Sequence, residues 1–228
     1  MAGRGARIGA AAVSLALGGL LLAMAVPRVV AEVVLLPGNR VLTLMQKGQA
    51  PSDRELELFI ATRRRSLVWA DQARVRTDLA LAELALAQRE IGGGPRYGEL
   101  VAAAEQSLRE GLARAPADPF AWARLGFGEL GAVEPGSRVA AALEMSLRTG
   151  RVEPGLSLAR LELCLIVWPD FPPASRPLIE DQIRLAWDRS QRQLVTAARV
   201  TNRVDTVRQA LAEPDRAQFD RRLAHPEE

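Results

Sequence analysis

The strongest constraint on the fold is an uninterrupted apolar run close to the N-terminus. Residues 8–26 contain no charged side chain. As a helix, about 19 residues rising 1.5 Å each would extend roughly 28 Å, close to the thickness of the hydrocarbon core of a bilayer. Arg4 and Arg7 precede the run and Arg28 follows it, as at a signal sequence or signal anchor. We therefore predict a transmembrane signal anchor at 8–26, preceded by a cytoplasmic segment at 1–7.

Two other interpretations of this run stay open. The sequence Ala23-Met24-Ala25 resembles a signal peptidase site, and cleavage after Ala25 would remove the helix from the mature protein. The second interpretation is a buried helix of a soluble protein, although Gly18-Gly19 and the absence of a polar face suit lipid better than water. We favour an anchor that is retained, because the h-region of a cleaved signal usually has only roughly 7–15 apolar residues.

Charges on the two sides of the run bear on its orientation. Arg4, Arg7 and the free amino group favour a cytoplasmic N-terminus, which would put the rest of the chain outside the inner (cytoplasmic) membrane. Arg28, Arg40 and Lys47 make the other flank similarly positive, so the side on which the domain lies stays open. The favoured location is a single-pass protein of the inner membrane with a periplasmic, extracytoplasmic C-terminal domain.

Residues 27–51 are predicted to form a juxtamembrane linker. Pro27 is expected to end the membrane helix, and the apolar stretch at 29–36 is too short for a second span. Pro37-Gly38-Asn39 is a turn signal, and the segment 46–51 is polar. Periodicity does not decide whether 29–36 is a strand or a helix, or whether it lies on the membrane surface or packs against the domain.

The remainder of the chain is expected to be all-α. Ala, Leu and Arg dominate and aromatic residues make up only 4% of the chain, which favours helices over strands. Ser52 and Glu55 form an S-x-x-E capping box, so a helix and the folded domain should begin there. For 228 residues one domain is the default, and we place it at 52–213. The segment 214–228 is predicted to be a polar, disordered tail.

Two features in the first half of this domain have functional alternatives. Arg63, Arg64 and Arg65 are expected on a solvated helix face, paired with neighbours such as Glu57, rather than against anionic lipid or an acidic partner. Gly92-Gly93-Gly94-Pro95 is expected to be a flexible loop. We do not predict a phosphate loop there, because the G-x-x-x-x-G-K-[ST] pattern and a preceding strand are missing.

The most specific pattern lies at 104–131, across the end of one expected helix and the start of the next. The residues that carry it are Ala104, Leu108, Pro116, Trp122, Leu125 and Gly126. Their spacing resembles that of the tetratricopeptide repeat, which has W-x-x-L-G, then A-x-x-x-F and a closing proline. The chain departs from this family at Leu108, where the repeat has Phe, and at Glu129, where it usually has Tyr. The resemblance covers one helical hairpin.

This resemblance implies an antiparallel array of helical hairpins that presents a curved surface to a protein partner. Ala104 and Gly126 would permit close helix approach. The groove-facing, partner-binding positions implied by the family are Phe120, Ala123, Arg124 and Phe127. Ala123 and Arg124 differ from the Lys/Asn pattern of the members that clamp a peptide carboxylate, so that activity is not carried over.

Further helices are expected beyond this hairpin. The segment 131–136 is predicted to be a loop, and a helix follows it as far as Thr149. The next helix is apolar on almost all sides, so it is expected to be buried, with Cys164 inside. After a proline-rich connector at 168–173, a last apolar stripe is expected to cover the end of the stack. It consists of Ile179, Ile183, Trp187, Leu194 and Ala198.

The chain offers little for catalysis or metal binding. His225 is its only histidine, which excludes a His-based triad and a histidine-rich metal site. Cys164, the sole cysteine, lies in an apolar setting that disfavours a thiolate nucleophile, and Glu180-Asp181 are expected to form surface ion pairs. A net charge of +3 with both signs interspersed lacks the clustered basic face of a nucleic-acid binder. We expect no enzymatic activity, cofactor, metal, nucleic acid or small-molecule substrate.

The anchor and the repeat hairpin together suggest a role in protein binding. The first hypothesis is a membrane-anchored scaffold or adaptor for protein–protein interactions in the bacterial cell envelope. The alternative is a non-catalytic accessory subunit that regulates an envelope enzyme complex, for example in surface-polysaccharide synthesis or secretion. A third hypothesis, a hydrolase that uses Glu or Asp, would need a deep pocket with converging carboxylates.

Overall fold

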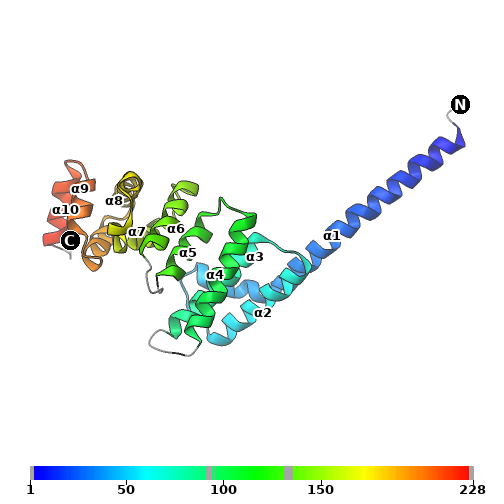
Figure 1. Ribbon diagram of the computed structural model, residues 1–228, viewed down its shortest axis with the longest axis horizontal. Coiled ribbons are helices and arrows are strands. Elements are labelled where there is room, and N and C mark those ends of the chain that lie inside the picture. The colour runs from blue at the N-terminus through cyan, green and yellow to red at the C-terminus, as the bar shows by residue number, and fades with distance from the viewer. Residues whose placement is uncertain (1–2, 91–93, 95, 131–135, 226–228) are drawn as a thin grey trace. The chain divides into compact units, whose positions relative to one another are not determined.

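The computed structural model describes residues 3–90, 94, 96–130 and 136–225. In these residues every regular element is a helix (Figure 1), as the composition predicted. The chain divides into two compact units, Met1–Ala103 and Ala104–Glu228, with the boundary inside α4 (Tyr97–Arg114), whereas one domain was expected. The loops expected at 92–95 and 131–136, like the chain ends at 1–2 and 226–228, lie wholly or largely outside the described residues.

Unit 1 is built from α1 (Arg4–Gln46), α2 (Asp53–Trp69), α3 (Ala73–Arg89) and the start of α4. The predicted capping box begins α2: the Ser52 hydroxyl accepts from the amide of Glu55, and the Glu55 carboxylate accepts from the amide of Ser52 at 2.8 Å. α2 packs against the second half of α1, and α3 packs against α2. The shared core consists of Val41, Leu56, Phe59, Ile60, Leu79, Ala82, Leu86, Ala87 and Leu100.

The course of α1 differs from the prediction. The helix does not end at Pro27 but continues through Pro27 and Pro37 to Gln46, so most of the expected linker at 27–51 is helical. Of the alternatives for 29–36, the structure has a helix that packs against the folded unit. The folded unit therefore begins well before Ser52.

Tertiary packing explains why the two prolines do not break α1. A proline removes one backbone hydrogen bond and costs about 3 kcal/mol in a helix interior. Ala31, Leu35 and Val41 are almost completely buried on the side of α1 that faces α2. Burial of a large aliphatic side chain contributes about 1.5–3 kcal/mol, so this face offsets a large part of the cost.

Unit 2 contains the rest of the helices. They are α5 (Pro119–Glu129), α6 (Gly136–Thr149), α7 (Ser157–Ile166), α8 (Arg176–Val200), α9 (Val204–Ala210) and α10 (Asp215–Ala224). The proline-rich connector before α8 forms two short 3-10 helices, η1 (Trp168–Asp170) and η2 (Pro173–Ser175). α5 packs against α6, α7 against α8, and both α9 and α10 against α8.

The close approach expected at Gly126 is present between α5 and α6. A β-carbon on Gly126 would lie 3.2 Å from the Leu143 side chain, so a larger residue there would have to push Leu143 back by a few tenths of an ångström. The Asp118 carboxylate caps α5 by accepting from the amides of Phe120 and Ala121. The Ser146 hydroxyl of α6 donates to the carbonyl of Pro119 at 2.7 Å, which ties the C-terminal end of α6 to the start of α5.

The core of unit 2 continues into the segment that was expected to be a disordered tail. The expected stripe at Ile179, Ile183, Trp187 and Leu194 is buried. The prediction for 214–228 is wrong for Asp215–Ala224, which form α10, and Phe219 on that helix is completely buried. Its ring meets that of Trp187 edge-on, with centroids 6.0 Å apart. Phe219, with the partly buried Leu223, thus holds a largely polar helix against the core.

Candidate membrane segment and binding surface

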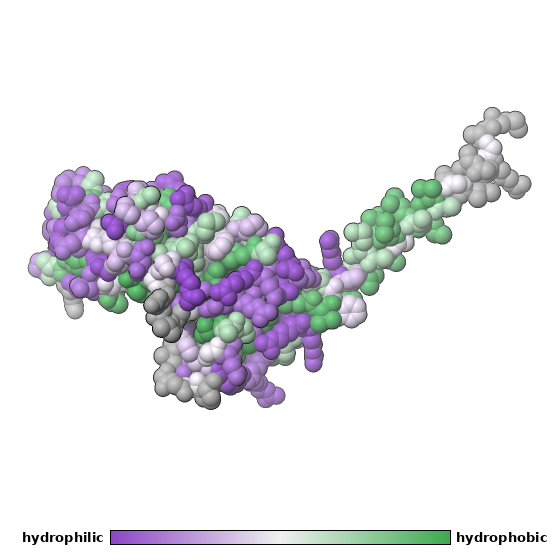
Figure 2. All heavy atoms as spheres, in the orientation of Figure 1, coloured by the Kyte–Doolittle hydropathy of each residue, from purple (hydrophilic) through white to green (hydrophobic). Residues whose placement is uncertain are grey.

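The first half of α1 exposes an apolar surface. In the described part of the chain, one helix is long and apolar enough to cross a membrane, the stretch of α1 from Ala11 to Gln46. The exposed large residues between positions 13 and 26 are Val13, Leu15, Leu17, Leu20, Leu21, Leu22, Met24 and Val26. Figure 2 shows this segment as an almost entirely hydrophobic surface. The residues of the predicted run at 11–26 are therefore exposed within unit 1.

An open groove of about 610 Å³ lies where this segment meets the end of α2. Met24, Pro27, Arg28 and Glu32 line it from α1, and residues 69–72 line it from the other side. Trp69 and the preceding Val68 expose 51% and 83% of their surfaces. An exposed Trp beside the end of an apolar helix is typical of the interface between a membrane and water.

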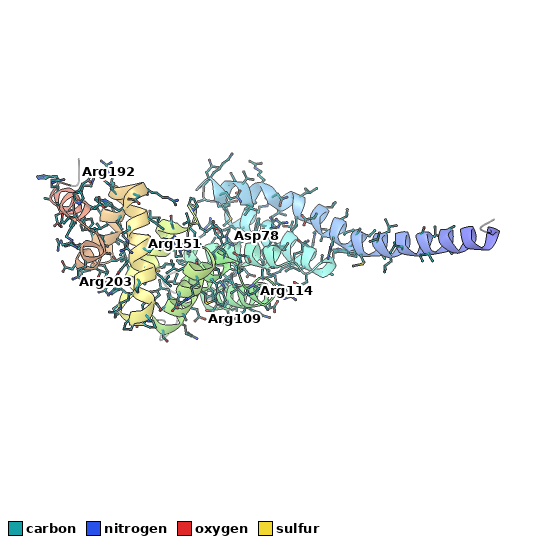
Figure 3. The ribbon with its side chains drawn as sticks, turned by 90° about the horizontal axis from the view of Figure 1, so that it is seen from above. Asp78, Arg109, Arg114, Arg151, Arg192 and Arg203 are labelled. Atoms are coloured by element: carbon teal, nitrogen blue, oxygen red, sulfur yellow. The ribbon has the colours of Figure 1, made fainter. Side chains whose placement is uncertain are left out.

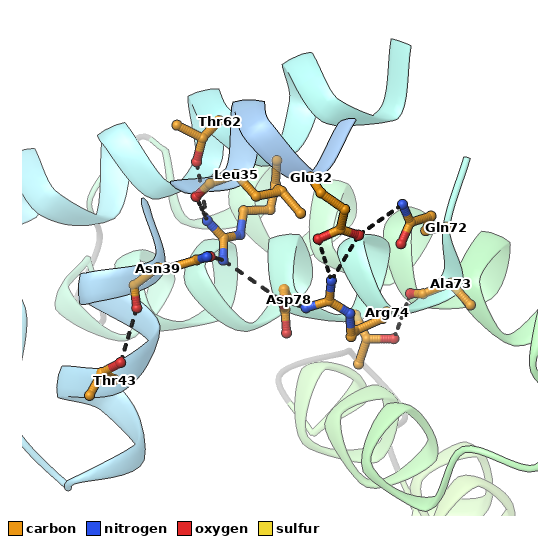
Figure 4. A network of polar contacts seen from close by, with 11 residues as sticks. Glu32, Leu35, Asn39, Thr43, Thr62, Gln72, Ala73, Arg74 and Asp78 are labelled. Atoms are coloured by element: carbon orange, nitrogen blue, oxygen red, sulfur yellow. Dashed lines mark hydrogen bonds and ion pairs between the residues drawn. The ribbon is translucent and has the colours of Figure 1, made fainter. Parts of the chain in front are cut away.

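The carboxylates of this groove are engaged by arginines. Glu32 pairs with Arg74 at 3.3 Å and accepts a hydrogen bond from Gln72 (Figure 4), and Asp71 pairs with Arg76 at 2.6 Å. Paired carboxylates that face different arginines stabilise the junction of α1 with α2 and α3. This arrangement differs from the two converging carboxylates that hydrolysis of a glycoside would use.

Arg63 is the centre of a buried polar network, and its predicted place on a solvated helix face is wrong. Its side chain is completely buried, with the guanidinium 3.6 Å from the centre of the Phe59 ring. The guanidinium donates to the Leu35 carbonyl and, at 3.0 Å, to the side-chain oxygen of Asn39 (Figure 4). Asp78 of α3 lies 3.9 Å away and compensates the buried charge.

The rest of the arginine triplet behaves differently. Arg65 is exposed, as predicted. Arg64 pairs with the buried carboxylate of Glu83 on α3 at 2.8 Å, and Glu57 pairs with Arg96 at 3.9 Å instead of with the triplet. Burial lowers the pKa of Arg63 to about 10 while Asp78 raises it, so the group stays charged at neutral pH. Its acceptors Leu35 and Asn39 come from α1 and its counter-ion Asp78 from α3, so the sequence around Arg63 does not indicate its burial.

The expected partner-binding residues lie on α5. Phe120, Arg124 and Phe127 are partly exposed, whereas Ala123 is only 4% exposed and offers little surface to a partner. Of the expected structural positions, Ala104 and Leu108 are completely buried and Leu125 is 8% exposed. Trp122 is half-buried, and its indole N–H donates to the carbonyl of Pro116 at 2.8 Å. This bond fixes the turn between α4 and α5.

Glu129, the residue that departs from the repeat pattern, is the centre of an ion-pair cluster. Its carboxylate is almost completely buried, yet it lies 2.7 Å from Arg109 of α4 (Figure 3) and 3.0 Å from Arg138 of α6. One carboxylate thus connects three successive helices of unit 2. This cluster has no local sequence signal, because its two arginines lie 20 positions before and 9 positions after Glu129.

Arg160 is a second buried arginine, inside the helix that was expected to be apolar on almost all sides. Its guanidinium donates to the carbonyls of Ser146 and Gly150 at 2.9 and 2.7 Å and to the side-chain oxygen of Gln182. The carbonyls at the end of a helix lack partners within it and carry partial negative charge, so a buried cation is well placed there. Arg160 therefore caps the C-terminus of α6 and fixes α7 and α8 around it.

The cysteine and one of the two adjacent carboxylates that could serve in catalysis are held in the fold, the first by burial and the second by an ion pair. Cys164 is completely buried, and this burial raises the pKa of its thiol to about 12. Asp181 forms two hydrogen bonds of 2.8 Å with Arg151, which hold its pKa below the usual value. Glu180-Asp181 thus includes the expected surface ion pair. In the residues that the structure describes, no cluster of His, Cys, Asp and Glu side chains is suited to a metal ion.

Comparison with protein-family models, with curated proteins and with solved structures finds no match to this chain. The evidence on its function is therefore the geometry of the chain itself. An exposed apolar helix becomes part of a folded α-helical unit, and a second helical unit carries the repeat-like pattern.

Proposed function

We propose that this protein is a membrane-anchored helical scaffold or adaptor that binds other proteins of the bacterial cell envelope. The observation that carries the proposal is the continuity of α1. One helix presents the apolar segment at 8–26 and then supplies Ala31, Leu35 and Val41 to the interior of unit 1. Unit 1 is then held at a fixed distance from the lipid, which a flexible linker would not achieve.

The end of α2 supports the membrane boundary that this proposal requires. Trp69 lines the same groove as Met24, Pro27 and Arg28, which are the last residues of the apolar run and the first after it. Tryptophan and arginine both favour the headgroup region, where an apolar body and a polar end are both satisfied. Under the proposal, Trp69 and Arg28 lie at the membrane surface and mark the point where α1 leaves the hydrocarbon.

The proposed partner surface is the exposed part of α5. Phe120 and Phe127 are seven residues apart, two turns along one side of the helix, and Arg124 lies between them. Two aromatic side chains with an arginine are typical of the residues that dominate protein interfaces. We infer that this surface receives an apolar or acidic segment of the partner, with Ala123 acting only as a packing residue.

Copurification tests the proposal. The full-length protein is expected to recover a reproducible partner from native membranes of its own organism, and Phe120→Ala with Phe127→Ala is expected to lose it. Ile166→Ala, which truncates an apolar side chain of unit 2 that is 44% exposed, serves as the matched control. Circular dichroism of each variant separates lost binding from unfolding. The absence of any partner in repeated experiments would contradict the proposal.

The proposed location is the inner membrane, with the folded units on the extracytoplasmic side. Alkaline phosphatase fused to the C-terminus is active only outside the cytoplasm, so an active fusion is expected. A fusion that is inactive, together with an active cytoplasmic reporter at the same position, would reverse this orientation and leave the anchor itself in place.

A further inference from the structure

Two rows of exposed apolar side chains with a period of seven residues run along α1. Within 8–26 nearly every position is apolar, so the rows are distinguished beyond this stretch, by Val29, Val33 and Leu36. One row consists of Leu15, Leu22, Val29 and Leu36; a second row, three residues earlier in each heptad, consists of Ala12, Gly19, Val26 and Val33. We call these two rows the α1 seam. All eight residues are exposed, and the six large ones expose between 47% and 82% of their surfaces. A seven-residue apolar repeat is the pattern of a helix that winds around another helix.

The seam lies on the side of α1 that unit 1 leaves open. Residues two apart in an α-helix point about 200° away from each other. The buried Ala31 therefore lies opposite Val29 and Val33, and the buried Leu35 lies opposite Val33. α2 covers one side of the helix, and the α1 seam occupies the other.

Lipid alone does not cover the whole seam. Leu36 is ten residues beyond Val26, or about 15 Å along the helix, and Arg28 and Glu32 lie between them. A span that ends near residue 26 leaves Val29, Val33 and Leu36 in water, where exposed apolar rows mark protein contacts. A single occupant of the whole seam would be a helix that accompanies α1 both in the bilayer and beyond it.

We propose that this occupant is α1 of a second copy of the chain, so that the protein is a parallel dimer. In a parallel pair each row of the seam meets the same row of the other copy, which gives a self-complementary, two-fold interface. Val26 and Val33 in one row, with Leu15, Leu22 and Leu36 in the other, match the β-branched and leucine positions that favour two-stranded parallel coiled coils, and Val29 is the exception in the leucine row. Two copies inserted in one membrane with the same orientation are parallel from the start.

The residues at both ends of the α1 seam are compatible with pairing to α1 of a second copy. Within the apolar segment, the row of Val26 and Val33 continues as Gly19 and Ala12, whose small size permits the close helix contact that drives association in lipid. Beyond Val33, the next position of the same row is Arg40, which is exposed. Two copies of Arg40 would repel each other in contact, so the pairing ends between Leu36 and Arg40.

Disulfide cross-linking in native membranes tests the inference. In a Cys164→Ala background, single cysteines replace Val29, Val33 or Leu36 in the seam. Arg28 and Arg65, exposed residues outside it, are replaced as controls. Mild oxidation is expected to give several-fold more disulfide-linked dimer at the three seam positions than at either control. The pair Arg28→Cys and Val29→Cys is the sharpest comparison, because the two positions are adjacent in sequence.

Light scattering of the full-length protein in mild detergent gives the second readout. The wild type is expected at twice the mass of one chain, and Val33→Arg, which places like charges in the seam, at the mass of one. Equal cross-linking at Arg28 and Val29, linkage of the seam cysteines to a different polypeptide, or a wild type with the mass of one chain would each overturn the dimer. None of these results would remove the protein from the membrane, so the proposed function is tested separately.

Discussion

Gly38 in α1 lies so close to the guanidinium of Arg63 in α2 that a methyl group at Gly38 would clash with it. The guanidinium has little room to retreat, because it is buried between the Phe59 ring and the carbonyl of Leu35. The glycine is thus required where α1 and α2 cross, although glycine is a poor residue for a helix interior.

The first prediction concerns this crossing. Gly38→Ala is expected to destabilise unit 1, even though alanine improves helix propensity by about 1 kcal/mol. Gly98→Ala in α4 is the matched control, since no atom lies within 4 Å of the added carbon, and it is expected to be neutral or stabilising. Thermal unfolding of the full-length protein in detergent, followed by circular dichroism, measures both. An increase in Tm for Gly38→Ala would show that the guanidinium is free to move.

The second prediction separates the buried arginine of the triplet from the exposed one. Arg63→Ala takes the donor away from Asn39 and the compensating cation away from Asp78, so a loss of about 3–5 kcal/mol is expected. Arg65→Ala removes only an exposed side chain and should change stability by less than about 0.5 kcal/mol. For a unit of this size, Arg63→Ala should lower the Tm by more than about 10 °C. Similar Tm values for the two variants would contradict the buried network.

These examples show where sequence reasoning succeeds and where it stops. The start of α2 was predictable, because the capping box of Ser52 and Glu55 acts within four positions along the chain. The close contact of Gly126 with Leu143 is between two helices, and it was predictable only through the resemblance to the repeat. The burial of Arg63 was not, since its partners Leu35, Asn39 and Asp78 come from two other helices. From the sequence alone, a run of three arginines predicts a solvated helix face, because the sequence does not show which elements surround it in the fold.

The course of α1 through its two prolines is a second feature that depends on long-range packing. Pro27 is a local signal for a helix end, and Pro37-Gly38-Asn39 is a local signal for a turn. The buried face of α1 against α2 depends on long-range packing, and this packing keeps the chain helical to Gln46. The candidate binding positions on α5 were placed by resemblance, and the structure shows that three of the four are accessible.

The third prediction is the pH dependence that follows from Cys164. Burial raises the pKa of its thiol from the ordinary 9.0 to about 12, so between these values the folded state keeps a proton that the unfolded state has lost. The stabilising contribution is complete below pH 9 and falls as the pH rises, by at most about 1.4 kcal/mol per pH unit.

Denaturant unfolding of the wild type and of Cys164→Ala at several pH values between 8 and 11 measures this effect. The range begins below the ordinary thiol pKa and ends above it. The difference in stability between the two proteins should be constant up to about pH 9 and then shrink. Alanine has no titrating group, so every other alkaline effect cancels in the comparison. Parallel profiles up to pH 11 would mean that the thiol is not buried in the way the structure shows.

The fourth prediction concerns α10. Phe219→Ala removes a completely buried ring from its contact with Trp187, and a cost of about 3–5 kcal/mol is expected for unit 2. Deletion of 214–228 should have a similar effect, because Phe219 is the buried residue of α10. Replacement of Leu223, which is partly buried, is the milder control. An unchanged unfolding transition after the deletion would mean that 214–228 is a disordered tail, as the sequence predicted.

The most direct test of the whole account is extraction of membranes from cells that express the full-length chain, first with alkaline carbonate and then with detergent. The apolar half of α1 predicts that the protein stays in the pellet after carbonate, enters solution only with detergent, and has the intact mass of all 228 residues. Release by carbonate, or a mature chain that begins after Ala25, would contradict the claim that α1 joins the folded units to the membrane.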